Sequence, residues 1–320
     1  MKTVGVLTSG GNAPGVNAAI RGVVRLASLK DFEVLGFEWG WDGLLTNRFR
    51  QLTPRSVSGI IHQGGTILHT ARCPEFRNTE GVTKAAETLA SHNLDGLVVI
   101  GGDGSLRGAL ELSKKTDALV VGIPASIDND VFGTDETIGF DTAVNTAVDE
   151  IDKIRDTADS LDRIFIVEVM GRTRGFLALT VGLAAGAEMI LVPEVKYETE
   201  KIFRTFREAK EKGKKSAIIV AAEGIGDTRQ LADELEKATR AEVRLTALGY
   251  TQRGGNPSAR SRLLANLFAE KALELLSSGQ GSRVTALQGG EITSVRLEQS
   301  CGTEKPLELN LLNLANKLAT

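Results

Sequence analysis

One order of segments recurs along this chain: a short apolar run, then a glycine-rich or polar loop, then a segment with helical spacing of apolar residues. The apolar runs predicted as strands are residues 4–8, 33–37, 96–100, 118–123, 163–169, 189–193, 216–222 and 244–248. The predicted helices include residues 17–28, 141–157, 199–212 and 257–277. Strands that alternate with helices form mainly parallel sheets with helices on both faces. We therefore predict an α/β fold, ending in a hairpin of residues 284–288 and 293–297.

Length and charge narrow the functional classes. The 320 residues are enough for two lobes, and 38 basic against 41 acidic residues give no basic excess of the kind that nucleic-acid binding needs. The two cysteines, Cys73 and Cys301, lie far apart and form no CxxC motif, so we expect no structural zinc and a reducing compartment. No apolar run approaches the roughly 20 residues of a membrane span, and the chain begins directly with a strand pattern. We expect a cytoplasmic protein that binds neither membranes nor nucleic acids.

Two glycine-rich loops follow predicted strands. Residues 9–15 hold three glycines and a proline before a helix, whose N-terminus offers free N–H groups to a phosphate, although a tight turn without a ligand explains this loop equally well. Residues 101–105 place Asp103 among glycines. A carboxylate beside phosphates requires a cation, so Asp103 is a candidate partner of Mg²⁺, the alternative being a residue that caps the next helix.

A third loop, residues 126–130, gathers Asp128 and Asp130 behind the hydroxyl of Ser126. One carboxylate can accept a proton from a substrate hydroxyl while the other holds a metal or orients its partner, and the alternative is an acidic surface turn. Ligands in parallel sheets bind at the carboxyl ends of the strands, and we expect every one of these loops to lie there.

Four arginines at strand ends form the last group of candidate site residues. Arginine binds phosphate in a bidentate manner and keeps its charge, so several arginines at strand ends predict capture of a phosphate on the substrate. The residues concerned are Arg163, Arg172, Arg244 and Arg253. Glu223, at the end of an apolar run, is placed to bind sugar hydroxyls.

These motifs, in this order and spacing, resemble those of the bacterial-type 6-phosphofructokinase family. The matching segments are residues 6–11, 101–105, 127–130, 169–172 and 252–255, and the likeness covers nearly the whole chain. The family transfers a phosphoryl group to fructose 6-phosphate. The resemblance implies two Rossmann-like three-layer lobes with the active site in the cleft between them. It also implies a nucleotide-binding lobe of residues 1–139 with 252–303, and a sugar-phosphate lobe of residues 140–251 with 304–320.

The resemblance also implies roles for single residues. Asp128 looks like the base for the sugar 1-hydroxyl, Ser126, Asp130 and Gly11 support the transferred group, and Arg172 stabilises its charge. Asp103 would organise Mg²⁺ on the nucleotide. The nucleotide positions are Gly11, Arg72, Cys73, Gly102, Asp103, Gly104, Ser105 and Gly108. The sugar-phosphate positions are Ser126, Asp128, Met170, Gly171, Arg172, Glu223, Tyr250 and Arg253, with Arg163 and Arg244 reaching a neighbouring subunit's substrate. A homotetramer is implied.

The phosphoryl donor can also be read from this likeness. Family members that use pyrophosphate carry an Asp at the position of Gly104 and a Lys at that of Ala125, and this chain has neither. ATP is therefore the expected donor, with ADP or pyrophosphate as the alternative. Two other readings stay open: a lipid or dinucleotide kinase, which shares the glycine–aspartate loop, and a non-catalytic nucleotide sensor, which the acidic residues disfavour.

At several positions this chain differs from the pattern of the family. Ala125 and Ser126 replace Gly-Thr, Tyr250 replaces a His, and Asn12 replaces an Asp. Residues that resemble ligands of an effector phosphate, such as ADP or phosphoenolpyruvate, are Arg21, Arg25, Arg55, Arg155, Glu188 and Lys214. The family's Arg one step before Arg55 is Pro54 here.

Overall fold

The computed structural model describes residues 2–319, which divide into two compact units. Unit 1 comprises Met1–Thr142 and Arg253–Lys305, and unit 2 comprises Ala143–Gln252 and Pro306–Thr320. The chain therefore crosses between the units three times, at points a few residues from the predicted boundaries.

Unit 1 is built on a sheet with the strand order β12-β11-β5-β4-β1-β2-β3, in which the short β6 also pairs with β5. The strands are β1 (Thr3–Ser9), β2 (Glu33–Phe37), β3 (Phe49–Leu52), β4 (Gly96–Gly101), β5 (Leu119–Ser126), β6 (Ile138–Gly139), β11 (Arg283–Gln288) and β12 (Glu291–Arg296). Only the outermost pairs, β2 with β3 and β11 with β12, are antiparallel. The central strands are parallel, and β4 is buried along its whole length because helices cover both faces.

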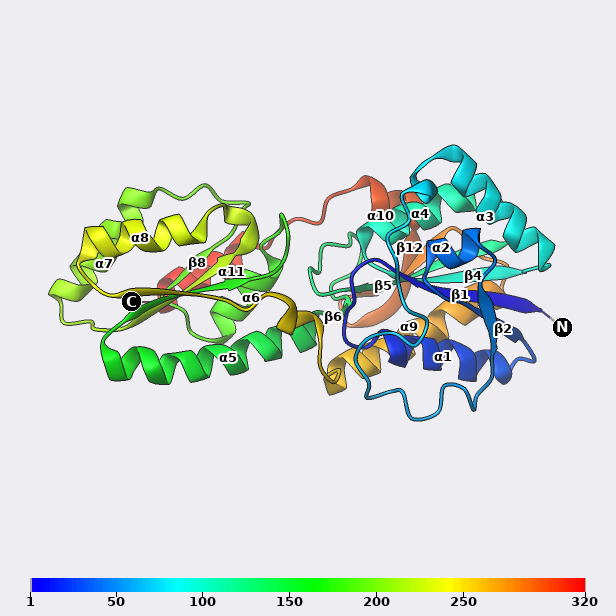
Figure 1. Ribbon diagram of the computed structural model, residues 1–320, viewed down its shortest axis with the longest axis horizontal. Helices are drawn as coiled ribbons and strands as arrows, with labels where there is room; N and C mark the ends of the chain where they lie inside the picture. The colour runs from blue at the N-terminus through cyan, green and yellow to red at the C-terminus, as the bar shows by residue number, and fades with distance from the viewer. Residues whose placement is uncertain (1, 320) are drawn as a thin grey trace. The chain divides into compact units, whose positions relative to one another are not determined.

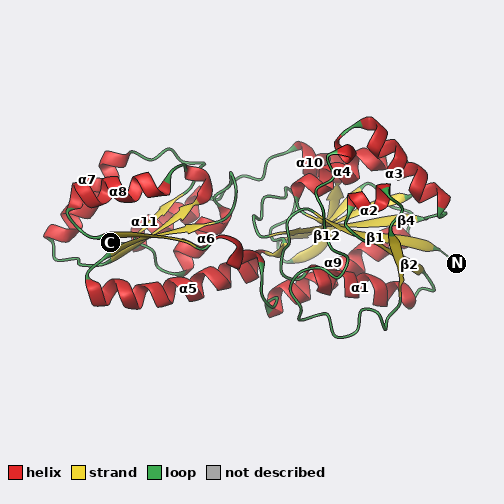
Figure 2. Ribbon diagram, viewed as in Figure 1, coloured by secondary structure: helices red, strands yellow, loops and turns green. Residues whose placement is uncertain are grey.

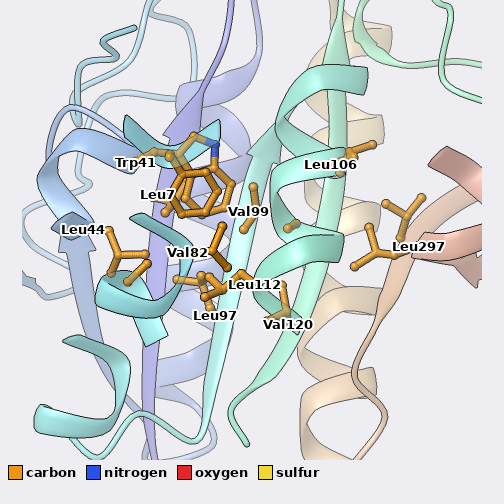
Figure 3. Close-up of a cluster of buried hydrophobic side chains, with 14 of the residues drawn as sticks. Leu7, Trp41, Leu44, Val82, Leu97, Val99, Leu106, Leu112, Val120 and Leu297 are labelled. Carbon is orange, nitrogen blue, oxygen red and sulfur yellow. The ribbon is translucent and has the colours of Figure 1, made fainter. Parts of the chain in front are cut away.

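Helices cover both faces of this sheet (Figure 1). They are α1 (Val16–Ser28), α2 (Trp41–Leu45), α3 (Thr79–Ser91), α4 (Asp103–Ser113), α9 (Ala259–Ser277) and α10 (Leu297–Gly302), with a 3₁₀ turn at Glu75–Arg77. On one face, α1 packs against α9 so closely that a Cβ at Gly22 would lie 2.7 Å from the Cβ of Ala269. On the other face, α2, α3, α4 and α10 bury Leu44, Val82, Leu106 and Leu297 over the strands (Figure 3).

Unit 2 is smaller and has four strands, all parallel, in the order β10-β7-β9-β8. These are β7 (Ile164–Val169), β8 (Met189–Leu191), β9 (Ala217–Ala222) and β10 (Val243–Ala247). The helices are α5 (Phe140–Leu161), α6 (Phe176–Ala184), α7 (Thr199–Glu211), α8 (Thr228–Thr239) and α11 (Leu309–Leu318), and Figure 2 shows them around the strands. Phe203, Phe206 and Leu235 of α7 and α8 pack on Ile166 and Ile219, whereas Gly182 of α6 contacts Ile190 and Val220 from the other face.

The predicted α/β class with mainly parallel sheets is confirmed in both units. Every predicted strand is present, and its ends differ from the prediction by two residues at most, except that β5 runs three residues further, to Ser126. The prediction did not include α2, β3, α3, β6, α8, α10 or α11.

Candidate active site

The site in unit 1 forms where the strand order reverses. From β1 the chain first adds β2 on one side and later β4 on the other, so the switch point of the sheet lies at the carboxyl ends of β1 and β4. Ser9 and Gly101, the last residues of the two strands, are register partners. A Cβ on Gly10 would lie 3.0 Å from the Ser105 Oγ, so the two glycine-rich loops touch. Ligands of open α/β sheets bind at such a switch point.

Asp103 is the first residue of α4, where a negative charge is favourable because the helix dipole is positive at its N-terminus. Its Oδ2 accepts a hydrogen bond from the Nε of Arg107 at 2.9 Å. This ion pair, which the sequence reading missed, leaves the Asp103 side chain 34% exposed toward a ligand. Beside it, a Cβ on Gly104 would meet no atom within 4 Å, so the space next to this glycine is open.

The loop that follows β5 is preorganised by its own hydrogen bonds. Asp128 is 4% exposed, and its backbone N–H donates to the Ser126 Oγ at 3.1 Å. Asn129 adopts a left-handed φ of 51°, and its Oδ1 accepts the N–H of Thr137 at 3.1 Å. Thr137 also donates its hydroxyl to the carbonyl of Ser126 at 2.5 Å. These bonds fix the backbone of the loop that carries the buried Asp128 carboxylate, the predicted general base.

The loops of Asp103 and Asp128 are neighbours. A Cβ on Gly102 would lie 3.4 Å from the Cβ of Ser126, which places the predicted metal loop against the predicted base loop. Arg253 lies against the loop after β1, since a Cβ on Gly11 would lie 2.6 Å from its Nη1, and its carbonyl accepts the Nδ2 of Asn12 at 3.3 Å.

Aromatic rings contact α4 at Gly108, one of the predicted nucleotide positions. Trp41 and Phe76 stack at 4.0 Å between ring centroids, and a Cβ on Gly108 would lie 3.0–3.2 Å from both rings. Gly108 therefore lets α4 lie directly on this pair, which the sequence reading did not identify. Cys73, half-buried, precedes Phe76, and burial raises the pKa of its thiol. Arg72, the remaining nucleotide position, is next to it in sequence.

In unit 2, the loop after β7 has a strained backbone. Arg172 has a left-handed φ of 54°, an uncommon conformation for a residue with a side chain. Its backbone N–H donates to the Glu223 Oε1 at 2.7 Å, which fixes this conformation. The contact is close, because a Cβ on Gly224 would lie 2.2 Å from the carbonyl oxygen of Arg172. Glu223 therefore holds the backbone of Arg172, in addition to its predicted role toward sugar hydroxyls.

The neighbouring backbone is fixed by a buried amide. The N–H of Met170 points to the Oε1 of Gln252 at 3.4 Å, and Gln252 is fully buried. Gly171 has a φ of 133°, which glycine adopts without strain. Tyr250, the departure from a family His, is 79% exposed in the 3₁₀ turn Gly249–Arg253.

Two of the four arginines predicted at strand ends lie at amino ends. Arg163 directly precedes β7, and Arg244 is the second residue of β10. Both lie at the amino edge of the unit 2 sheet, about 20 Å from the loop of Arg172 for six residues of strand. Both contact Glu242: the Arg163 Nε lies 2.6 Å from Oε2, and the Arg244 Nη2 donates to Oε1. Glu242 was not identified from the sequence.

The predicted effector residues fall into two groups. In unit 2, Glu188 accepts ion pairs from Arg155 at 3.7 Å and Lys214 at 3.3 Å. In unit 1, Arg21 and Arg25 lie one turn apart on α1, and desolvation together with the charge of Arg25 lowers the pKa of Arg21. The remaining member of this group, Arg55, is exposed in the turn before Ser58.

A family model described as Phosphofructokinase matches residues 3–276, most of the chain. The chain belongs to the phosphofructokinase family. Two curated relatives are named ATP-dependent 6-phosphofructokinase, one from Bacillus mycoides (strain KBAB4) and one from Bacillus cereus (strain AH187). Each is 47% identical to this chain over 319 residues, and each alignment covers 100% of both chains.

Solved structures agree on the phosphofructokinase fold. Phosphofructokinase from Saccharomyces cerevisiae superposes with a TM-score of 0.87 at 33% identity, over 100% of this chain and 48% of that chain. The present chain thus spans about half the length of the yeast one. A pyrophosphate-dependent phosphofructokinase from Marinobacter aquaeolei superposes with a TM-score of 0.85 at 22% identity, over 97% and 86% of the two chains, which supports the fold alone. None of the helices within residues 2–319 combines the length and hydropathy of a membrane span.

Proposed function

We propose that this chain is an ATP-dependent 6-phosphofructokinase, which transfers the γ-phosphoryl group of ATP to the 1-hydroxyl of fructose 6-phosphate. The observation that carries the proposal is the contact of two acidic loops at the carboxyl ends of β4 and β5, where Gly102 lies against Ser126. Full-length identity of 47% to relatives named for this activity supports the same conclusion.

The proposed chemistry divides between the loops. The Asp128 carboxylate accepts the proton of the sugar 1-hydroxyl. As it does so, the hydroxyl oxygen forms a bond to the γ-phosphorus of ATP, and the bond from that phosphorus to ADP breaks. Positioning and charge stabilisation account for most of the rate in phosphoryl transfer. Arg172 supplies positive charge for the transferred group, and Glu223 holds the Arg172 backbone in its left-handed conformation.

Asp103 is the proposed protein partner of Mg²⁺, which neutralises the phosphates of the nucleotide. Among residues 2–319 there is no cluster of three acidic, His or Cys side chains that could bind a metal ion without help. A site with one exposed carboxylate suits Mg²⁺, because this ion takes most of its ligands from substrate phosphates and water.

The open space at Gly104 supports a nucleoside triphosphate as the donor. An Asp at this position would fit the folded chain, since no atom lies within 4 Å of the Cβ, so the glycine is explained by a ligand rather than by packing. Near the end of β5, the position where pyrophosphate-dependent members carry a lysine is occupied by Ala125, which is 1% exposed, so this chain has no lysine there to bind pyrophosphate.

We further propose a homotetramer with an effector site. Arg163 and Arg244 lie too far from the loop of Arg172 to join the same sugar phosphate in one subunit, which supports their use by a neighbouring subunit. Two groups of cationic side chains are of the kind that bind ADP or a phosphoenolpyruvate-like effector. One is Arg21 with Arg25 on one face of α1, and the other is Arg155 with Lys214.

The test is an assay of the purified chain with fructose 6-phosphate and, separately, ATP, ADP and pyrophosphate. We expect turnover with ATP that stops on chelation of Mg²⁺ and returns on its addition. Turnover with pyrophosphate and none with ATP would refute the donor assignment, and none with any donor would refute the function. Light scattering in the same buffer measures the oligomeric state.

A further inference from the structure

Glu242 has no role in the proposed chemistry, yet it contacts both arginines at the amino edge of unit 2. Its Oε2 lies 2.6 Å from the Arg163 Nε, and its Oε1 accepts from the Arg244 Nη2. The carbonyl of Glu242 also accepts the N–H of Ile164 at 3.0 Å, so the glutamate is anchored to the start of β7 beside Arg163. One carboxylate thus bridges two guanidinium groups from neighbouring strands.

We infer that Glu242 is a positioning residue, which holds Arg163 and Arg244 as a preformed pair for the phosphate of the sugar substrate. This inference rests on the proposed function. Each guanidinium has five N–H donors, and the bridge uses one from each, so most donors remain for a phosphate. The pair and Glu242 together keep a net positive charge, which still attracts an anion.

Two physical effects make such a bridge useful. Two guanidinium groups held close together repel each other, and a carboxylate between them removes most of that cost before the substrate arrives. Arginine side chains also have many rotamers, and ordering them in advance reduces the entropy that binding must overcome. The Arg163 side chain is 26% exposed and that of Glu242 36% exposed, so this half of the bridge is shielded in part from solvent screening, whereas the Arg244 side chain is 54% exposed.

An opposite expectation follows if Glu242 acts only as a competing anion. Its removal would then raise the positive charge at the amino edge and tighten phosphate binding. The direction of the change in affinity therefore separates positioning from competition.

The experiment compares the wild-type chain with Glu242→Ala, Glu242→Gln and Glu242→Asp in steady-state assays with saturating ATP. For Glu242→Ala we expect the half-saturating concentration of fructose 6-phosphate to rise about ten-fold, the scale of one charge-assisted hydrogen bond, with kcat within about two-fold. Glu242→Gln keeps the shape without the charge and should resemble the alanine variant. Glu242→Asp keeps the charge and should recover part of the affinity.

Three controls isolate the effect. Glu200→Ala removes the same charge from an exposed ion pair with Arg207 in the same unit and should leave the half-saturation unchanged. Inorganic phosphate, used as a competitive inhibitor, should lose affinity in parallel with the sugar phosphate in Glu242→Ala. In an Arg163→Ala background, Glu242→Ala should add much less, because one of the two bridged groups is already absent.

Each remaining outcome is decisive. An active wild-type enzyme whose Glu242→Ala variant has unchanged or lower half-saturation overturns the inference and leaves the proposed function standing. If Glu242→Ala does not fold, the shorter Glu242→Asp side chain provides the test. An affinity of Glu242→Asp for fructose 6-phosphate equal to that of wild type also overturns the inference. A wild-type chain without turnover on fructose 6-phosphate refutes the proposed function instead.

Discussion

Replacement of Gly224 by alanine should slow the enzyme by misplacing Arg172. The added Cβ would lie 2.2 Å from the carbonyl oxygen of Arg172 and 3.1 Å from the Thr173 Cα. Both are backbone atoms, so no side-chain rotation can relieve the clash, and the loop must move by about 1 Å to restore ordinary contact. A displacement of that size at a catalytic group costs about 10²-fold in rate.

The expected result is a fall in kcat of about 10²-fold, with a loss of folding stability of about 1–3 kcal/mol from overpacking. Steady-state kinetics with ATP and fructose 6-phosphate measure the first, and denaturant unfolding of unliganded protein measures the second. Gly302→Ala is the matched control, because no atom lies within 4 Å of its added Cβ. A folded Gly224→Ala enzyme with wild-type kcat would show that the contact of Gly224 with this loop does not place Arg172.

Three more substitutions or measurements test other parts of the site. Asp128→Ala should lower kcat by at least about 10²–10⁴-fold while calorimetry still detects fructose 6-phosphate binding, and an unchanged kcat would remove Asp128 from the role of base. Gly104→Asp should leave the thermal midpoint unchanged, since the space is open, but raise the KM for ATP; undiminished ATP use would contradict the steric account of donor choice. Burial raises the pKa of Cys301 to about 11, so on the order of 0.1% of its thiol is ionised at pH 8. A thiol reagent should therefore modify the more accessible Cys73 first, with ATP protecting it, and preferential labelling of Cys301 in native protein would refute this.

The sequence predicted the elements whose apolar pattern is continuous and missed those that depend on tertiary contacts. β4 is apolar throughout and was located to within a residue. β3 is largely exposed, and its strand conformation comes from pairing with β2 rather than from its own residues. α8 was missed although Asp227 caps it and Leu231 and Leu235 share one face, a signal that was present in the sequence.

Within the site, the sequence indicated which residues are candidates for function but not which residues contact one another. Asp103 and Asp128 stand out because carboxylates among glycines or beside a hydroxyl need a chemical reason. The contact of Glu223 with the N–H of Arg172 spans 51 positions of sequence and depends on the pairing of β7 with β9. The bridge of Glu242 depends on the register of β10 with β7 in the same way. No local pattern encodes such a register, so these contacts required the structure.

The discontinuous course of unit 1 has a consequence for synthesis on the ribosome. The face of α1 is covered by α9 and the edge of β5 by β11, and both partners follow the whole of residues 143–252. At the usual rate of translation, those residues take roughly 5–20 s to add. Throughout that interval the nascent chain exposes an apolar helix face and an unpaired strand edge, the two features that promote aggregation. The N-terminal segment of this enzyme is therefore a natural client for ribosome-associated chaperones, and it completes its fold only after the central segment has emerged.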